Sequence, residues 1–261
     1  MGLMNRIRDA LTPMSRPIWG SAWAEPAPDA PFFAIGDIHG CYDAMRRLLD
    51  KTMAIDDSAV VVCVGDLIDR GENSAGVLRF MAEHASGPDT RLHSLMGNHE
   101  AMLLSMLDDP VLTGPHWLRY GGLQTLASFG LTGLTDAVAA DAQPDTMLDI
   151  RDRLRDAMGP GIEAWLRGRP NLWTSGAVSV VHAGASPWET LDRQEVGHLV
   201  WGHPDFATVP RRDGHWIVHG HHIVPGPTKG DGRIAIDTGA YATGRLTGVY
   251  VHPDRTEFLT S

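Results

Sequence analysis

Residues 32–40 read FFAIGDIHG, a short apolar run followed at once by glycine and by two potential metal ligands, Asp37 and His39. The same arrangement returns at residues 59–71, AVVVCVGDLIDRG, and at residues 91–100, RLHSLMGNHE. Short runs that are rich in apolar and β-branched residues and bounded by glycine are typical of buried strands. Each stretch therefore predicts a strand whose carboxyl end leads into polar groups.

Further strands are predicted at residues 177–181, 216–218, 233–236 and 248–251, and helices at 44–53, 74–84 and 100–107. Alternation of strands and helices in the first half indicates an α/β core. The later strands lie close together in the sequence, so we expect that half to be more antiparallel. Strand signals fade between residues 108 and 170, where 117–129 and 146–158 are typical of helices. This stretch is either a helical cap inserted beside the sheet or a set of plain core helices.

The chain has 261 residues, which is enough for one large domain with a buried core. Residues 1–31 are rich in proline and offer little to bury, so we expect a flexible N-terminal tail before a domain at 32–261. No run approaches the ~18 apolar residues of a membrane span. Cys41 and Cys63 match no metal-binding spacing and are expected to be free thiols, which favours a reducing, cytoplasmic compartment.

The formal net charge of −10 argues against nucleic acid as a partner, because binding to a phosphate backbone needs a basic surface. Small phosphorylated substrates remain possible in spite of this charge. Divalent cations bound at one site reverse the local field there.

Five of the predicted strands end in a potential metal ligand; the ligands after the last two of these strands are His182 and His221. In open α/β sheets, ligands bind beyond the carboxyl ends of the strands, so these side chains are expected to converge. Imidazole and carboxylate groups together suit manganese, iron, cobalt or zinc. A carboxylate such as Asp66 can bridge two ions that lie ~3.5–4 Å apart.

The glycine-bounded motifs at 36–40, 65–71 and 97–100 resemble, in order and spacing, the three signature motifs of the phosphoprotein phosphatase family. His182-Ala183-Gly184 and Gly220-His221 resemble its two later metal-histidine motifs. The resemblance extends from residue 32 to about residue 251. It implies a calcineurin-like metallophosphoesterase fold of mixed α/β class, a β-sandwich flanked by helices with a helical cap insertion at about 108–170.

Residue by residue, the resemblance implies two divalent metal ions, with manganese as the first expectation and iron, zinc or cobalt as alternatives. One ion would be held by Asp37, His39 and Asp66, and the other by Asp66, Asn98, His182 and His221. A hydroxide between the ions would attack phosphorus directly.

The same resemblance implies that His99 protonates the leaving oxygen and that Asp69 orients it. Arg70, with its planar fork of donors, would grip the phosphate oxygens together with Asn98. A weaker assignment places Tyr241 near the substrate phosphate.

One position departs from the family pattern. Many bacterial relatives carry a second phosphate-binding arginine shortly after a tryptophan, where this chain has His203 after Trp201. Either His203 replaces that arginine, which would weaken phosphate binding or make it dependent on pH, or Arg211 or Arg212 supplies the contact instead.

Three functions compete. The first is a phosphoprotein phosphatase that acts on phosphoserine or phosphothreonine, or on phosphotyrosine. The second is a symmetrical diadenosine tetraphosphate hydrolase, a related family that usually lacks an aspartate at position 69 and tends to have aspartate at position 100. Asp69 and Glu100 therefore favour the first, with a phosphoprotein or a small phosphoester as substrate. The third is a non-catalytic phosphate-binding module, against which the complete ligand set argues.

Overall fold

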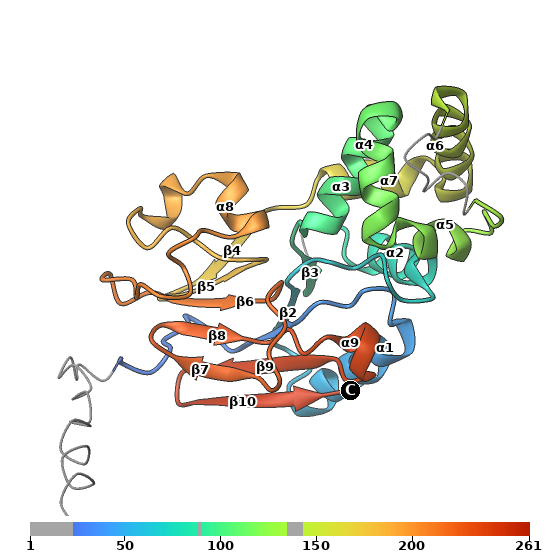
Figure 1. Ribbon diagram of the computed structural model, residues 1–261. Coiled ribbons are helices and arrows are strands. Elements are labelled where there is room, and N and C mark those ends of the chain that lie inside the picture. The colour runs from blue at the N-terminus through green and yellow to red at the C-terminus, as the bar shows by residue number, and fades with distance from the viewer. Residues whose placement is uncertain (1–22, 88–89, 135–142) are drawn as a thin grey trace, which may run out of the picture.

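Two five-stranded sheets form the centre of the computed structural model, which describes residues 23–87, 90–134 and 143–261 (Figure 1). The first sheet has the strand order β10-β9-β1-β2-β3. Its strands are β1 (Phe32–Ile35), β2 (Val60–Cys63), β3 (Leu92–Ser94), β9 (Thr247–His252) and β10 (Arg255–Thr260). The second sheet has the order β4-β5-β6-β8-β7. Its strands are β4 (Leu172–Ser175), β5 (Val178–Val181), β6 (Trp216–His219), β7 (Thr228–Gly230) and β8 (Arg233–Ala235).

Parallel pairing occurs at the middle of both sheets. Strands β1, β2 and β3 are parallel to one another, and so are β5, β6 and β8. The prediction of a more antiparallel second half is therefore wrong for these central strands, because residues 182–215 return the chain to the start of β6. The prediction is correct for β9 and β10 and for the pairs at the edges of the second sheet.

The two sheets pack face to face through alternate side chains of their strands. Phe32 and Ala34 of β1 lie in one apolar cluster with Val180 of β5 and Val218 of β6. Side chains on the other face of the first sheet, such as Phe33, lie in a second cluster with the helices. Because β1 is buried on both faces, it reads as a continuous apolar run. The predicted mixed α/β sandwich is confirmed.

Helices cover the outer faces of both sheets. Those on the first sheet and beside it are α1 (Tyr42–Ile55), α2 (Ser74–His84), α3 (Asn98–Asp108), α4 (Pro110–Trp117), η1 (Leu118–Gly122), α5 (Leu123–Ser128), α6 (Pro144–Met158) and α7 (Pro160–Arg167). The later ones are η3 (Leu191–Arg193), α8 (Val196–Trp201) and α9 (Ala240–Thr243). Figure 1 shows α3 to α7 grouped on one side of the sheets and α8 on the other.

Local chemistry fixes where the helices between residues 110 and 167 begin. Proline occupies the first position of α4, α6 and α7, where its missing N–H costs nothing. The Asp109 side chain accepts a hydrogen bond from the backbone N–H of Leu112 and so caps α4. We refer to the described parts of residues 110–167 as the helical segment.

Residues 23–31, which the sequence assigns to the tail, contact the second sheet. The Trp23 and Trp216 rings meet edge to face with their centroids 5.7 Å apart. Asp29 accepts a hydrogen bond from the backbone N–H of Gly176. The remainder of the predicted tail, residues 1–22, lies outside the described residues. Among the helices that are described, none is both long and apolar enough to cross a membrane.

Candidate active site

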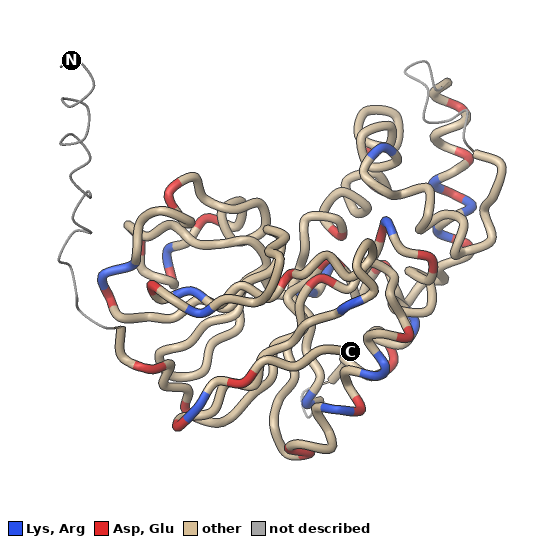
Figure 2. Tube along the Cα trace, turned by 60° about the horizontal axis from the view of Figure 1, so that its bottom comes forward, with Lys and Arg blue, Asp and Glu red and all other residues tan. Residues whose placement is uncertain are grey.

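Polar side chains from four strand ends and from one helix start meet at a single place. Figure 2 shows acidic positions in the middle of the molecule, where its two halves meet. The loops after β1, β2, β5 and β6 and the first turn of α3 supply the following residues, in chain order: Asp37, His39, Asp66, Asp69, Arg70, Asn98, His99, His182 and His221. Parallel strands present their carboxyl ends at the same edge of a sheet, so the β1–β2–β3 and β5–β6 halves each contribute to this cluster.

Asp66 lies between the His39 ring on one side and a group formed by His182, Asn98 and His221 on the other. Its Oδ1 is 3.3 Å from His182 Nε2, and its Oδ2 is 3.5 Å from His39 Nε2. Asn98 Oδ1 lies 2.9 Å from His182 Nε2 and 2.8 Å from His221 Nδ1. One carboxylate oxygen thus faces each group, which is the arrangement needed for Asp66 to bridge two ions.

The imidazole rings are oriented by backbone carbonyl groups. His39 Nδ1 lies 2.7 Å from Ile68 O, and His182 Nδ1 lies 3.1 Å from Val64 O. If each Nδ1–H donates to its carbonyl, each Nε2 presents a lone pair to the centre of the cluster. The Nε2 lone pair of His182 would then face two further acceptors, Asn98 Oδ1 at 2.9 Å and Asp66 Oδ1 at 3.3 Å, with no proton to share. A cation satisfies this arrangement.

The charges of the cluster also fit cations. Burial raises the pKa of Asp37 well above its ordinary value, and the negative charges of Asp237 and Asp66 add to the effect. Burial and the charge of Asp66 raise the pKa of Glu100 to about 8. Burial lowers the pKa of His39 and of His221 to about 4, so these rings are neutral at pH 7. Buried carboxylates that repel one another, beside neutral imidazoles, match the donor set of a site for two divalent ions.

Backbone strain is concentrated at this cluster. Six described residues other than glycine have positive φ, and five of them carry side chains of the site: His39, Asp66, Asp69, Arg70 and His221. Such conformations cost on the order of 1–3 kcal/mol each and persist where the surrounding structure over-determines them. Two glycines make room here, because a Cβ atom on Gly97 would overlap Asp66 and a Cβ atom on Gly220 would overlap the carboxylate of Asp37.

Glu100, which was not predicted as a site residue, anchors the loop after β2. Its carboxylate is buried and accepts hydrogen bonds from the backbone N–H groups of Asp66, Leu67 and Gly97 at 2.8–3.0 Å. A shorter side chain would not reach these donors from the same helix position. Glu100 thereby fixes the position of Asp66 relative to α3.

His99 and Asp69 form a buried pair beside the cluster. His99 Nδ1–H donates to Asp69 Oδ2 at 2.7 Å, and His99 Nε2 faces Asp66 Oδ2 at 3.9 Å. Burial works against a charged imidazole, but the hydrogen bond to Asp69 and the charges of Asp66 and Asp69 outweigh it, so the pKa of His99 is raised.

The helical segment holds the Asp69 carboxylate in place. The indole Nε1–H of Trp117 donates to it at 3.0 Å, and the hydroxyl of Thr125 donates at 2.6 Å. The backbone N–H of Arg70 donates to the carbonyl of Gly121 at 3.4 Å. Trp117 and Thr125 were not predicted as site residues, and no motif in the sequence marks them.

Arg70 and Tyr241 lie together at the edge of the cluster. The Arg70 guanidinium group lies 5.0 Å from the centre of the Tyr241 ring, and its Nη1 is 3.0 Å from His39 Nε2. The Tyr241 ring also meets the His39 ring edge to face at 5.3 Å. Both side chains are thus brought next to the cluster.

His203 and Arg211, unlike Arg70, make their contacts with other parts of the chain. The His203 ring packs against His198 at 4.6 Å, and its Nδ1 accepts the backbone N–H of Asp205. Arg211 is buried and donates to the carbonyls of Ser186 and Glu189, so its guanidinium group is committed to a loop. The structure therefore brings neither His203 nor Arg211 into the group of contacts described above.

Two further residues border the cluster. Asp237, whose side chain accepts the N–H of Gly239, adds negative charge beside Asp37. It follows the apolar run 233–236, the same signal that marked Asp37 and Asp66, so the sequence could have identified it. The His222 ring lies 4.9 Å from that of His221.

Comparison with known proteins gives consistent matches. A sequence model of the family described as calcineurin-like phosphoesterase matches residues 30–232. A protein of Dechloromonas aromatica (strain RCB), a symmetrical bis(5'-nucleosyl)-tetraphosphatase, is 32% identical over 67% of this chain and 52% of its own length, so the chain spans about half of that relative. A protein of the same name from Ralstonia nicotianae (strain ATCC BAA-1114 / GMI1000) is 28% identical over 83% of this chain and 88% of its own.

A solved structure has the same fold. The crystal structure of a putative diadenosine tetraphosphatase superposes with a TM-score of 0.61 at 20% sequence identity. The match covers 92% of this chain and 98% of that one.

Proposed function

The chain belongs to the calcineurin-like phosphoesterase family, and we propose that it hydrolyses symmetrical dinucleoside tetraphosphates to two nucleoside diphosphates. The observation that carries this substrate is the pair of relatives named as symmetrical tetraphosphatases, one of which aligns over most of both chains. They support the second function weighed from the sequence better than the first. Family membership also identifies the chain as a hydrolase.

In the proposed reaction, water adds to one of the two inner phosphorus atoms, and the central anhydride bond breaks. The hydroxyl group of water stays on that phosphorus, and the oxygen of the leaving nucleoside diphosphate takes the electron pair. Two divalent ions, when bound, supply Lewis acidity at phosphorus and lower the pKa of water, and we expect manganese to serve. Six residues would hold them: Asp37, His39, Asp66, Asn98, His182 and His221.

Arg70 and His99 would act on the substrate directly. Arg70 would donate to the phosphate oxygens, and Tyr241 would hold the guanidinium group from one side through its ring. His99 would donate a proton to the leaving oxygen, with Asp69 orienting the ring and raising its pKa.

A second candidate, hydrolysis of phosphomonoesters such as those of phosphoproteins, is favoured by the Asp69–His99 pair itself. An alkoxide that leaves from a serine or threonine ester is strongly basic and needs a proton in the transition state. A nucleoside diphosphate is a far weaker base, so its departure depends less on a proton. A buried carboxylate that orients His99 and raises its pKa is therefore of more use to ester cleavage than to anhydride cleavage.

Product analysis separates the two candidates. The manganese-loaded protein is incubated with diadenosine tetraphosphate and, in parallel, with phosphoserine, phosphothreonine and phosphotyrosine peptides, and the products are resolved by chromatography. The proposal predicts ADP as the only nucleotide product, with kcat/KM for the dinucleotide at least tenfold above that for any peptide, where tenfold corresponds to about 1.4 kcal/mol. AMP with ATP as products, or a preference for a peptide, would contradict it.

A further inference from the structure

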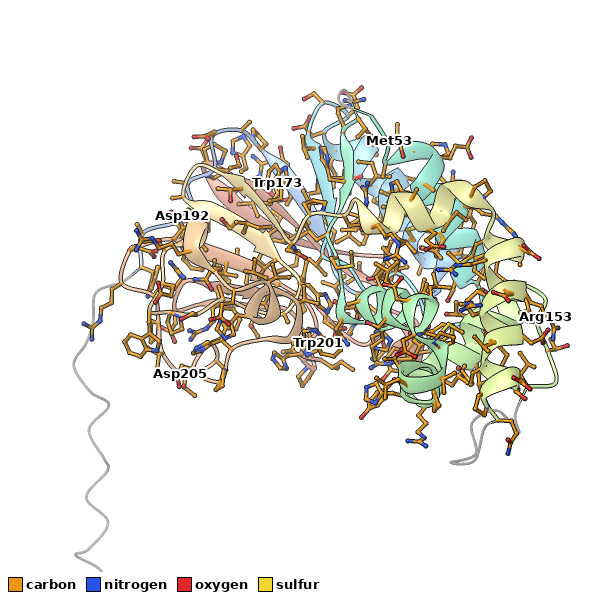
Figure 3. The ribbon with its side chains drawn as sticks, turned by 90° about the horizontal axis from the view of Figure 1, so that it is seen from above. Met53, Arg153, Trp173, Asp192, Trp201 and Asp205 are labelled. Atoms are coloured by element: carbon orange, nitrogen blue, oxygen red, sulfur yellow. The ribbon has the colours of Figure 1, made fainter. Side chains whose placement is uncertain are left out.

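A cavity of about 300 Å³ opens between the helical segment and α8. This volume is at the lower end of the range typical of small-molecule sites. Its lining is largely apolar and aromatic and comes from α3, α4 and the end of α8: Met102, Ser105, Leu112, Thr113, His116 and Trp201. Figure 3 shows Trp201 in the space between α8 and the helices of the other half.

The cavity begins one helical turn from the proposed proton donor. Met102 follows His99 by three residues on α3, which places both side chains on the same side of the helix. On the opposite wall, Trp201 precedes Gly202, and a Cβ atom on Gly202 would lie 3.6 Å from His222 and 3.9 Å from Ala183. Ala183 and His222 are each adjacent in the chain to a proposed metal ligand. Both walls of the cavity are thus connected to elements that carry residues of the cluster.

One ring pair and one backbone hydrogen bond link the cavity to the loop that carries Arg70. The His116 and Tyr120 rings are 4.6 Å apart, and Tyr120 precedes Gly121, whose carbonyl accepts the N–H of Arg70. Trp201 is 48% exposed and Leu112 is 77% exposed, which are high values for large apolar side chains. Aromatic surface of this kind is suited to stacking against a flat ring.

Two hydroxyl groups of the cavity can act as acceptors. The hydroxyl of Ser105 donates to the carbonyl of Ala101, and that of Thr113 donates to the carbonyl of Asp109. Each hydroxyl oxygen keeps lone pairs that can accept a hydrogen bond from an amino group. A purine base with an exocyclic amino group combines a flat apolar face with such a donor.

We propose that this cavity binds the purine base of the leaving nucleoside diphosphate, with Trp201 stacking on the ring. The proposal rests on the proposed function, because only a nucleotide substrate has a leaving group of this kind. Trp201 would be a residue that determines specificity for the leaving group, and it would take no part in bond cleavage.

The test measures product inhibition in the manganese-loaded full chain. Hydrolysis of p-nitrophenyl phosphate is inhibited with ADP or with pyrophosphate, which has the phosphate groups but no base. Trp201→Ala is expected to raise the inhibition constant for ADP about tenfold, the loss of one stacked base, and to leave that for pyrophosphate within about twofold. Trp201→Phe, which keeps a ring, should stay close to the wild type.

Trp188→Ala is the matched control, since Trp188 is 58% exposed on the same half of the molecule but does not line this cavity. The proposal would be overturned if Trp201→Ala changed the inhibition constants for ADP and pyrophosphate equally, or changed neither. It would also be overturned if ADP did not inhibit the wild type. Turnover of diadenosine tetraphosphate by the wild type is measured separately. If the wild type does not hydrolyse diadenosine tetraphosphate, the proposed function is refuted. If the wild type hydrolyses it but Trp201→Ala leaves the inhibition constant for ADP unchanged, only the base site is refuted.

Discussion

The loops after β1, β2, β5 and β6 carry most of the proposed metal ligands, whereas the helical segment carries none of them. The loops place their side chains by local means, through positive φ angles and glycines against which other residues pack. The helical segment is distant from the loops in the sequence, and it contacts them through Trp117 and Thr125, which donate hydrogen bonds to the Asp69 carboxylate.

This difference suggests a division of labour. The loops form the charged centre that any member of a metal-dependent esterase family needs. The helical segment would control the proposed proton donor, His99, through Asp69, and its helix α4 would form one wall of the proposed base site. Substitutions in the loops should therefore abolish the reaction, and substitutions in the helical segment should change which leaving groups are accepted.

The largest effect is expected for Asp66→Asn. Asparagine removes the negative charge that faces the proposed ligands on both sides, so metal content should fall and kcat should drop on the order of 10³-fold or more for every substrate. Metal analysis of the purified protein and steady-state kinetics measure this. Asp231→Asn is the control, because Asp231 also has positive φ but is exposed. Retention of both ions and of activity in Asp66→Asn would show that the loops do not form the centre.

Asp69→Asn should separate the substrates. Without the carboxylate, His99 loses the hydrogen bond that orients it and raises its pKa, so kcat for a phosphoserine peptide should fall about 10²-fold or more. Cleavage of diadenosine tetraphosphate, whose leaving group depends less on a proton, should fall less than about tenfold by the same reasoning. Equal losses for both substrates would mean that the pair serves the metal centre and not the leaving group.

Trp117→Phe tests the helical segment alone. Phenylalanine keeps most of the buried ring but removes the N–H donor to Asp69, which should cost about 1–3 kcal/mol of stability and lower kcat for the peptide about tenfold. Metal content should be unchanged. Trp165→Phe is the matched control, since its indole also donates in the helical segment, to the carbonyl of Ala85 and away from the site. An equal kcat loss in the control would remove the special role of Trp117.

Tyr241→Ala should have the smallest effect. It removes the ring beside Arg70, an interaction of roughly 0.5–1 kcal/mol at a partly exposed position, so KM should rise about two- to fivefold with little change in kcat. Tyr241→Phe keeps the ring and should behave like the wild type. A large loss of kcat in both variants would instead assign a direct role to the phenol hydroxyl.

Much of the fold could be predicted from the sequence because its central strands are buried. All seven predicted strands are present, and the three missed ones lie at sheet edges. The residues of β7 are all exposed, and β10 is mostly exposed with alternating charged side chains, so neither has an apolar run to reveal it. Strand β4 is only partly buried.

Some residues of the site could also be predicted from the sequence, and others could not. Proposed ligands such as Asp37 and His182 lie within two residues of the end of an apolar run, so their position at strand ends could be predicted from the sequence. Trp117 and Thr125 lie 48 and 56 residues from Asp69 and meet it only through helix packing, which no local pattern encodes. His203 was predicted from family spacing, and its role in phosphate binding stays a prediction that the contacts with His198 and Asp205 do not support.

A metal titration tests most directly whether the cluster around Asp66 is a two-metal hydrolytic centre. Chelator-treated protein is titrated with manganese while bound metal and cleavage of diadenosine tetraphosphate are followed in the same samples. We expect two ions per chain and no cleavage before metal is added. In Asp66→Asn, both metal binding and cleavage should stay below the levels of the wild type. Full cleavage by the metal-free protein, or two ions bound with neither the dinucleotide nor any phosphopeptide cleaved, would contradict the assignment of a two-metal hydrolytic centre.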